Sequence, residues 1–277
     1  MRAVPRFQHE PLDHSVDSIR LIQILPDLSP CGRIRCRMHH TVIKNAIYTC
    51  LSYEWGTEGG GDCITINDEL YRVRQNLLDF LEVARKIYFQ TSLWIVALCI
   101  DQTNNSERSH QGNRMGTIYS QAPEVWTWLG QDSTTAKVLT DLDINLRKPQ
   151  SIDGFYGGLH GSFIRGDWEL VRGNSYSTWA WITQEIALAR KIWLLAQDKQ
   201  IDKGVLPYRL VHQIPVLRGL RDLNPKTDSL FALLHTFRKQ QCKIKRDTVF
   251  SLLALCQIGT NIAVNYTLPD SEISGTY

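Results

Sequence analysis

The amino-acid sequence predicts an α/β fold in which helices flank a parallel sheet. Short apolar, β-prone runs alternate along the chain with segments whose apolar residues recur at helical spacing. The stretch 93–130 shows this alternation without interruption, as an apolar run, a polar corner, a helical segment and a second β-rich run. Because two parallel strands need a crossover connection, we interpret this stretch as a βαβ unit.

The N-terminal region, residues 1–45, is predicted to be a polar arm that carries one short strand. That strand is Ser18–Leu25, an apolar run ended by Pro26. A second β-prone run, Ile47–Tyr53, is followed closely by a glycine cluster, Gly59–Gly61. A glycine-rich loop after a strand can hold phosphate, but this one has neither a GxGxxG motif nor a P-loop lysine.

A hairpin and a helix are predicted next. Ile64–Asn67 and Tyr71–Val73 are expected to pair as the two strands of the hairpin. Asn76 is expected to cap an amphipathic helix. The apolar face of that helix comprises Leu77, Phe80, Leu81, Ala84, Ile87 and Tyr88.

The βαβ unit begins with Leu93–Ile100, an eight-residue apolar run typical of a strand buried on both faces. Asp101 and Gln102 open a polar corner of turn and cap residues. Pro123 ends the helix that follows, and Glu124–Leu129 is the next predicted strand. The helix itself is predicted from the spacing of Met115, Ile118, Tyr119 and Ala122.

Residues 131–175 are predicted to be an insertion. It contains a helical segment, Ala136–Leu146, and a long glycine-rich loop, Gly154–Gly166. A strong helix, Thr178–Arg190, and an apolar strand, Lys191–Ala196, then return to the alternating pattern.

Beyond residue 197 the pattern is helical, with apolar spacing in Ser229–Arg238 and Thr248–Cys256. The predicted organisation is therefore an arm, a domain over 46–196 and a helical extension over 197–277. The extension is expected either to form a separate unit or to complete the core. Its last residues carry no obvious cap, which favours a truncated chain.

Composition limits the classes of function. The net charge of +3, without a Lys/Arg-rich run, gives no electrostatic case for binding nucleic acid. No apolar run is long enough to span a membrane, and the N-terminus lacks the apolar segment of a signal peptide. The seven cysteines are scattered and odd in number, as expected of reduced thiols, so we predict a cytoplasmic protein.

No metal site is predicted. Cys31, Cys36, His39 and His40 lie close in sequence, but the C-x4-C spacing is loose and no second ligand pair follows. An edge strand is the favoured interpretation of this segment. Cys99 lies inside an apolar run, where a thiol is normally inert.

Ligands of an open α/β sheet bind beyond the carboxyl ends of its strands. Glu185 would also lie at the carboxyl ends of the strands if its helix begins near that edge of the sheet. The side chains predicted at this edge include carboxylates, hydroxyls and a tryptophan but no cationic clamp. This composition favours a flat, sugar-bearing ligand over a bare phosphate. The other residues predicted at this edge are Ser52, Tyr53, Glu54, Trp55, Gly56, Asp101, Gln102 and Gly130.

Each candidate also has a structural interpretation. Tryptophans such as Trp55 and Trp181 are more often core residues than ligand platforms. Glu185 follows Gln184 in the first turns of its helix, where an acid complements the helix dipole.

Three ordered blocks of the sequence resemble the HET (heterokaryon incompatibility) domain of filamentous fungi. They are CLSYEWG at 50–56, the whole stretch 93–130 and WITQEIALAR at 181–190. The segment RDTVFSLLAL at 246–255 is similar to one that commonly follows this domain. The resemblance covers about residues 46–196.

The chain departs from the pattern of this family at three positions. Val96 stands where the family usually has aspartate, Asp101 where it has asparagine, and Trp179 where it has arginine. Losing an acid and a base together would remove a buried ion pair while leaving two apolar sites, which a fold can tolerate. One hypothesis is therefore an inactive, degenerate copy.

The resemblance implies a role in allorecognition, in which an incompatible partner protein or self-association triggers programmed cell death. HET domains are in turn similar to TIR domains, which implies a flavodoxin-like sheet and NAD as a substrate rather than a resident cofactor. Trp181 and Glu185 resemble the tryptophan-x-x-x-glutamate setting of NAD-cleaving TIR domains, which implies that Glu185 is catalytic. The implied substrate-binding residues are Ser52, Tyr53, Trp55, Gly56, Asp101, Gln102 and Trp181. The alternative is a non-catalytic assembly module of the TIR type.

Overall fold

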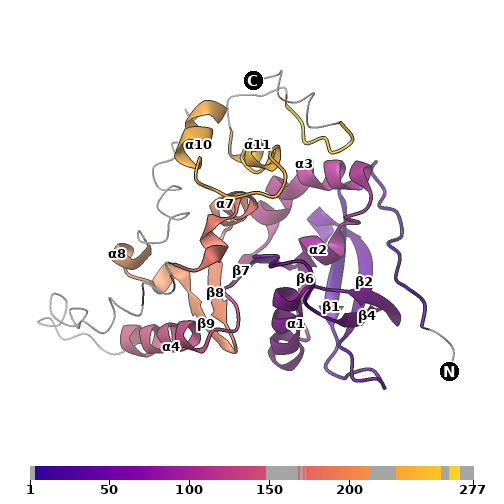
Figure 1. Cartoon of the computed structure of the whole chain (residues 1–277), viewed down its shortest axis with the longest axis horizontal. Coiled ribbons are helices and arrows are strands. Elements are labelled where there is room, and N and C mark those ends of the chain that lie inside the picture. The colour runs from indigo at the N-terminus through magenta and orange to yellow at the C-terminus, as the bar shows by residue number, and fades with distance from the viewer. Residues whose placement is uncertain are drawn as a thin grey trace, which may run out of the picture.

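Nine strands among the described residues form one mixed sheet, in the order β5-β4-β2-β1-β6-β3-β7-β8-β9 (Figure 1). The computed structural model describes residues 4–147, 168, 171, 173–211, 229–256 and 262–268. The strands are β1 (Ser18–Ile24), β2 (Arg35–Val42), β3 (Thr49–Tyr53), β4 (Cys63–Ile66), β5 (Glu69–Arg72), β6 (Ser92–Ile95), β7 (Glu124–Trp128), β8 (Ile192–Ala196) and β9 (Lys199–Asp202).

Helices cover both faces of this sheet (Figure 1). The α-helices are α1 (Gln75–Ile87), α2 (Val96–Cys99), α3 (Asn105–Gln121), α4 (Ser133–Arg147), α7 (Ala180–Ala187), α8 (Tyr208–Val211), α10 (Leu230–Thr236) and α11 (Asp247–Phe250). The short helical turns are η1 (Ile43–Asn45), η2 (Ser175–Thr178), η3 (Lys203–Val205) and η4 (Leu253–Leu255).

The centre of the sheet confirms the predicted α/β class. β6, β3, β7 and β8 are parallel neighbours, and their chain order across the sheet is 2-1-3-4, the flavodoxin-like arrangement. Antiparallel strands extend this centre on both sides, since β1 pairs antiparallel with β6 and β9 pairs antiparallel with β8. The expectation of a parallel sheet therefore holds for its central strands and for the pair β2 and β4, but not for the whole sheet.

The N-terminal strands belong to the sheet itself. β1 lies between β2 and β6, and its side chains are almost all buried. β2 lies between β1 and β4, so the edge-strand interpretation of the segment with Cys36, His39 and His40 is wrong. The predicted hairpin is confirmed as the antiparallel pair β4 and β5.

Two local predictions fail in the first half. The run Leu93–Ile100 is not one strand, because β6 ends at Ile95 and α2 follows directly. An apolar run cannot by itself distinguish a buried strand from a buried helical turn. Asn76 is not the cap of α1, which begins one residue earlier, at Gln75, with Arg74 in the cap position.

The predicted helices after β6 are confirmed, with changed bounds. Asn104 caps α3 by accepting hydrogen bonds from the backbone N–H groups of Ser106 and Glu107. α7 is shorter than predicted, because η2 precedes it and it ends at Ala187. β9 contradicts the all-helical expectation beyond residue 197, and the predicted loop Gly154–Gly166 lies outside the described residues.

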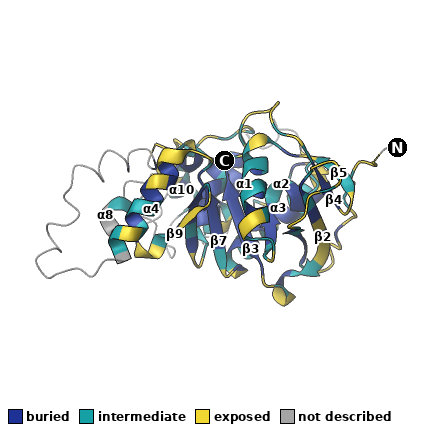
Figure 2. Ribbon diagram, turned by 90° about the horizontal axis from the view of Figure 1, so that it is seen from below, coloured by how far each residue is buried: buried dark blue, intermediate teal, exposed yellow. Residues whose placement is uncertain are grey.

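Side chains of β3 divide between the two faces of the sheet. Cys50 and Ser52 point toward α3 and α7, whereas Tyr53 points toward the face covered by α1. α10 and α11 lie outside α3 and α7, near the top of Figure 1. Figure 2 shows that burial is deepest along the central strands, including β3 and β7. None of the described helices is both long enough and apolar enough to cross a membrane.

Candidate active site

A buried polar network joins α7 to β3. Ser52 Oγ donates a hydrogen bond to Glu185 Oε2, and the hydroxyl of Tyr176 lies 2.6 Å from the same Ser52 Oγ. The Tyr176 hydroxyl also donates to Thr127 Oγ1 at 3.4 Å. This contact is possible because Ser52 and Thr127 are direct partners in the β3–β7 register. The exposed fractions are 6% for Glu185 and 0% for Ser52.

The environment of Glu185 changes its acidity. Burial raises the pKa of Glu185 to about 7, although hydrogen bonds from Ser52 and Tyr119 act in the opposite direction. Within the described ranges no lysine or arginine forms an ion pair with this carboxyl. A carboxyl that titrates near neutral pH can exchange protons under physiological conditions, as catalytic acids and bases do.

The network lies just beneath the carboxyl ends of β3 and β7. These strands are first and third in chain order within the parallel centre, so their carboxyl ends mark the topological switch point. The chain turns away from the sheet at Gly56 and Gly130, whose φ angles are 72° and 104°, values that glycine adopts readily. Ser175 Oγ donates to Glu54 Oε2, which ties η2 to this edge.

Asn76 holds the switch point together from α1. Its Nδ2 donates to the carbonyl of Glu54 at 2.6 Å, and its Oδ1 accepts from Trp128 Nε1 at 3.0 Å. One side chain therefore bridges the ends of β3 and β7, a tertiary role that its expected capping role did not suggest.

Cations are present at this edge, so the prediction that it has no cationic clamp is wrong. Arg74 Nη1 donates to the carbonyl of Gly56 at 3.0 Å, and its guanidinium carbon lies 5.4 Å from the ring centroid of Trp55. Lys243 and Arg74 both form ion pairs with Glu58. The sequence could not show this, because Lys243 is 185 positions away from Glu58.

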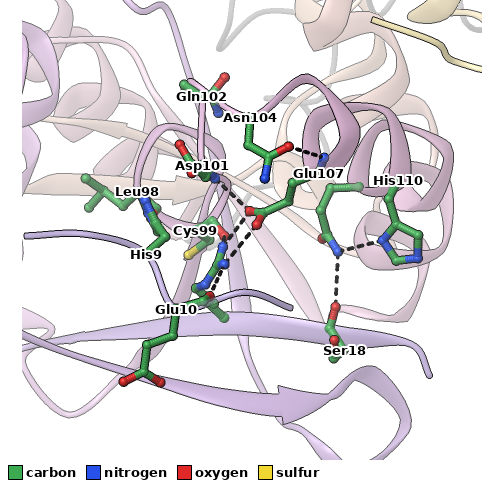
Figure 3. A network of polar contacts seen from close by, with 12 residues as sticks. His9, Glu10, Ser18, Leu98, Cys99, Asp101, Gln102, Asn104, Glu107 and His110 are labelled. Atoms are coloured by element: carbon green, nitrogen blue, oxygen red, sulfur yellow. Dashed lines mark hydrogen bonds and ion pairs between the residues drawn. The ribbon is translucent and has the colours of Figure 1, made fainter. Parts of the chain in front are cut away.

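A second buried network surrounds Glu107 (Figure 3). Arg20 donates to both carboxylate oxygens of Glu107, at 2.6 Å and 2.9 Å, and both side chains are almost fully buried. Such a two-pronged pair fixes both partners in orientation. Two features of the sequence could have indicated this ion pair. One is an arginine inside the apolar run of β1, and the other is a glutamate three residues after the Asn104 cap.

This ion pair supports the polar corner after α2. Glu107 Oε1 accepts from the backbone N–H of Asp101 at 2.7 Å, and Arg20 Nη1 donates to the carbonyl of Cys99 at 2.9 Å (Figure 3). Burial raises the pKa of Glu107, but the hydrogen bonds from Arg20 and Asp101 outweigh that effect and hold the pKa below its ordinary value. The N-terminal arm also contacts this corner, since His9 Nε2 lies 2.7 Å from the carbonyl oxygen of Leu98.

The predicted corner residues have local partners. Asp101 Oδ1 accepts from the backbone N–H and the hydroxyl of Thr103, at 3.0 Å and 2.7 Å. Gln102 Nε2 donates to the carbonyl of Val96 at 2.9 Å. Asp101 belongs to the Glu107 network through its backbone N–H, and none of these contacts joins Asp101 or Gln102 to Glu185.

Trp181 also lies apart from the switch point. Its ring packs against the cluster formed by Phe250, Val264 and Tyr266. The structure thus brings Ser52 and Glu185 together and places Trp55 and Gly56 at the edge above them. It directs Tyr53 to the opposite face and Trp181 to the C-terminal segment.

Val96 and Trp179 pack in different apolar clusters. Val96 contacts the main core around β1, β3 and β6, whereas Trp179 contacts the cluster formed by α4, α7 and β8. Their apolar character therefore matches their surroundings. In the described part of the chain, no group of three or more His, Cys, Asp or Glu side chains could hold a metal ion.

The strand order and the buried acid beneath the switch point define a doubly wound α/β domain with a candidate ligand-binding edge. Comparison with known families places this domain more narrowly. Residues 48–185 match the family described as heterokaryon incompatibility protein (HET), and the chain is therefore a HET-domain protein.

A curated relative carries the same designation. The chain is 29% identical over 126 residues to "Heterokaryon incompatibility protein 6, OR allele" of Neurospora crassa. The aligned region covers 40% of this chain and 18% of the relative, so the chain spans less than a fifth of the relative's length. No solved structure matches the chain.

Proposed function

We propose that this chain acts in heterokaryon incompatibility, as an effector domain that starts cell death by cleaving the N-glycosidic bond of NAD. The family match and the name of the Neurospora relative support the biological role. The observation that carries the chemical part is the buried carboxyl of Glu185, with a pKa of about 7, beneath the switch point of the sheet.

In this proposal NAD binds along the carboxyl edge of β3 and β7. Trp55 supplies an aromatic side chain at this edge. It is 36% exposed, so one part of its ring is free to stack against the nicotinamide. Ser175 and Tyr176 of η2 lie between the edge and Glu185, since one contacts Glu54 and the other contacts Ser52. Binding must therefore displace η2 before the ribose reaches the acid.

The proposed reaction needs one carboxylate and one water molecule. The bond between ribose C1′ and the nicotinamide nitrogen breaks, and its electron pair leaves with the neutral nicotinamide. The ribose becomes oxocarbenium-like, and ionised Glu185 stabilises its positive charge. Water then adds to C1′ and releases one proton. Ser52 holds the carboxylate in position through its hydrogen bond.

NAD turnover by purified wild type and Glu185→Gln tests this proposal. We expect Glu185→Gln to lose turnover by at least about a hundredfold, because it cannot carry the stabilising charge. Glu82→Gln is the matched control, since Glu82 lies on the exposed side of α1 and forms a surface ion pair with Arg85. Wild-type protein that is folded yet leaves NAD intact in every assembly state would rule out the reaction.

A second candidate function is a non-catalytic assembly module, and the burial of Glu185 favours it. A carboxyl that is 6% exposed and already bonded to Ser52 can serve to join α7 to β3. Contact would then depend on surface rings such as Phe231, which is 80% exposed. Toxicity that survives Glu185→Ala but is lost in Phe231→Ala would favour this candidate. Toxicity that appears only after Val96→Asp with Trp179→Arg would instead indicate a degenerate copy.

A further inference from the structure

Two cations and an exposed ring meet where the chain leaves β3. The Arg74 guanidinium lies over the Trp55 ring and binds the carbonyl of Gly56. Lys243, from the segment between α10 and α11, reaches the same loop through Glu58. The three side chains come from separate parts of the sequence, so the fold has assembled them.

A carboxylate already occupies the space between these cations. Glu58 forms ion pairs with both Arg74 and Lys243, yet its side chain is 66% exposed. Ion pairs at such exposed positions contribute little to stability. A ligand with two or more negative charges would therefore compete effectively with Glu58 for both cations.

The N-terminus of α1 lies beside the loop that carries Glu58. The loop comes so close to the connection between β5 and α1 that a Cβ on Gly61 would lie 2.0 Å from the carbonyl oxygen of Val73. In the described part of this region, no side chain caps the N-terminus of α1 and its first turn contains no acid. The positive end of that helix dipole therefore points toward the same loop.

We infer that Trp55, Arg74 and Lys243 form the binding site for the pyrophosphate and an adjoining base of a nucleotide. The inference rests on the proposed function and names the part of the dinucleotide that this edge holds. The two cations bind the phosphates, and the Trp55 ring stacks with the base or nicotinamide next to them. Glu58 is an internal competitor that the ligand displaces.

Calorimetric titration of the full chain with ADP-ribose tests the site directly. Arg74→Gln and Lys243→Gln are each expected to weaken binding by about tenfold, because each removes a charge-assisted contact. Glu58→Gln is expected to strengthen binding by a few fold, since it removes the competing carboxylate. The matched controls are Arg72→Gln and Lys245→Gln, which remove the same charges from exposed positions two residues away.

Inorganic pyrophosphate distinguishes a nucleotide site from a phosphate site. We expect Trp55→Leu to weaken binding of NAD by about tenfold, measured in the Glu185→Gln background that leaves the ligand intact, while changing pyrophosphate binding much less, because only NAD has a ring to stack. Equal losses for both ligands in Trp55→Leu would overturn the assignment of the base. Equal effects of Arg74→Gln and Arg72→Gln would overturn the whole site.

The same titration separates this inference from the catalytic proposal. In Glu185→Gln, binding of ADP-ribose should still depend on Arg74 and Lys243, because Glu185 lies beneath the edge and touches neither cation. Binding that depends on Arg74 without NAD turnover would support the site and contradict the catalytic proposal. Turnover that depends on Glu185 but not on Arg74 or Lys243 would support the catalytic proposal and contradict the nucleotide site.

Discussion

Gly116 of α3 and Ala254 of η4 approach so closely that a Cβ on Gly116 would lie 2.6 Å from the Cβ of Ala254. One turn earlier, a Cβ on Gly112 would lie 2.7 Å from Val264 Cγ1. The C-terminal segment therefore docks on α3 through two positions that lack a side chain. The same segment contributes Phe250, Val264 and Tyr266, against which Trp181 of α7 packs.

The first prediction concerns this docking. Gly116→Ala should destabilise the protein by about 1 kcal/mol, although alanine in a helix is ordinarily favoured by about that amount. The clash with Ala254 causes the reversal, because neither backbone can move away freely. Chemical denaturation of the single variants and of the double variant Gly116→Ala/Ala254→Gly provides the check. The double variant should recover stability, and a stabilised Gly116→Ala would show that the segment does not dock here.

The second prediction concerns the ion pair between Arg20 and Glu107. Removing one partner, as in Arg20→Met or Glu107→Leu, should cost about 3–5 kcal/mol, because the other charge is left buried and unpaired. The double variant should lose less than the sum of the two single losses. A double-mutant cycle in urea measures this coupling. Additive losses would mean that the two groups act independently, contrary to their two hydrogen bonds.

The third prediction concerns pH and Glu185. Because the folded state raises the pKa of Glu185 to about 7, its stabilising effect is present in full below the unfolded pKa and declines as pH rises through 7. Wild type should lose about 3 kcal/mol relative to Glu185→Gln between pH 4.5 and pH 7.5. Parallel urea titrations of the two proteins across this range give the difference. A difference that does not change with pH would show that folding does not shift the pKa of Glu185.

The fourth prediction concerns Asn76. Asn76→Ala should destabilise the fold by about 1–3 kcal/mol, since the Glu54 carbonyl and the Trp128 indole would both lose a partner. Gln75→Ala is the control, because Gln75 is exposed and its side chain bonds to Asp79 on the same helix. Thermal unfolding compares the two variants. Similar midpoints for both would show that Asn76 does not bridge the strands.

Sequence patterns predicted the central elements well. β3, β7, β8, α1 and α3 follow apolar periodicities that depend only on local residues. The same patterns misjudged Val96–Cys99, which is apolar enough for a strand but forms a helical turn. Contacts from distant residues hold that turn in place, including Arg20 at the carbonyl of Cys99 and Tyr71 at the carbonyl of Ala97.

The sequence indicated individual residues of the candidate site but not the contacts between them, because those contacts join residues that are distant in sequence. Ser52 and Glu185 were both proposed, yet their contact could be seen only once α7 was placed against β3. Arg74 and Lys243 were missed because their role depends on the Gly56–Gly61 loop. Tyr176 was missed because a lone tyrosine in a polar segment carries no periodic signal.

The position of β1 has a practical consequence for experiments on isolated fragments. The family match begins at residue 48, but β1 supplies the neighbour on which β6 pairs, and β8 supplies the neighbour of β7. A fragment limited to 48–185 would expose the backbone edges of both strands, which are buried and apolar. Such open edges recruit other chains, so we expect that fragment to aggregate when expressed alone. Insolubility of the fragment would then reflect two missing neighbours and not the activity of the domain.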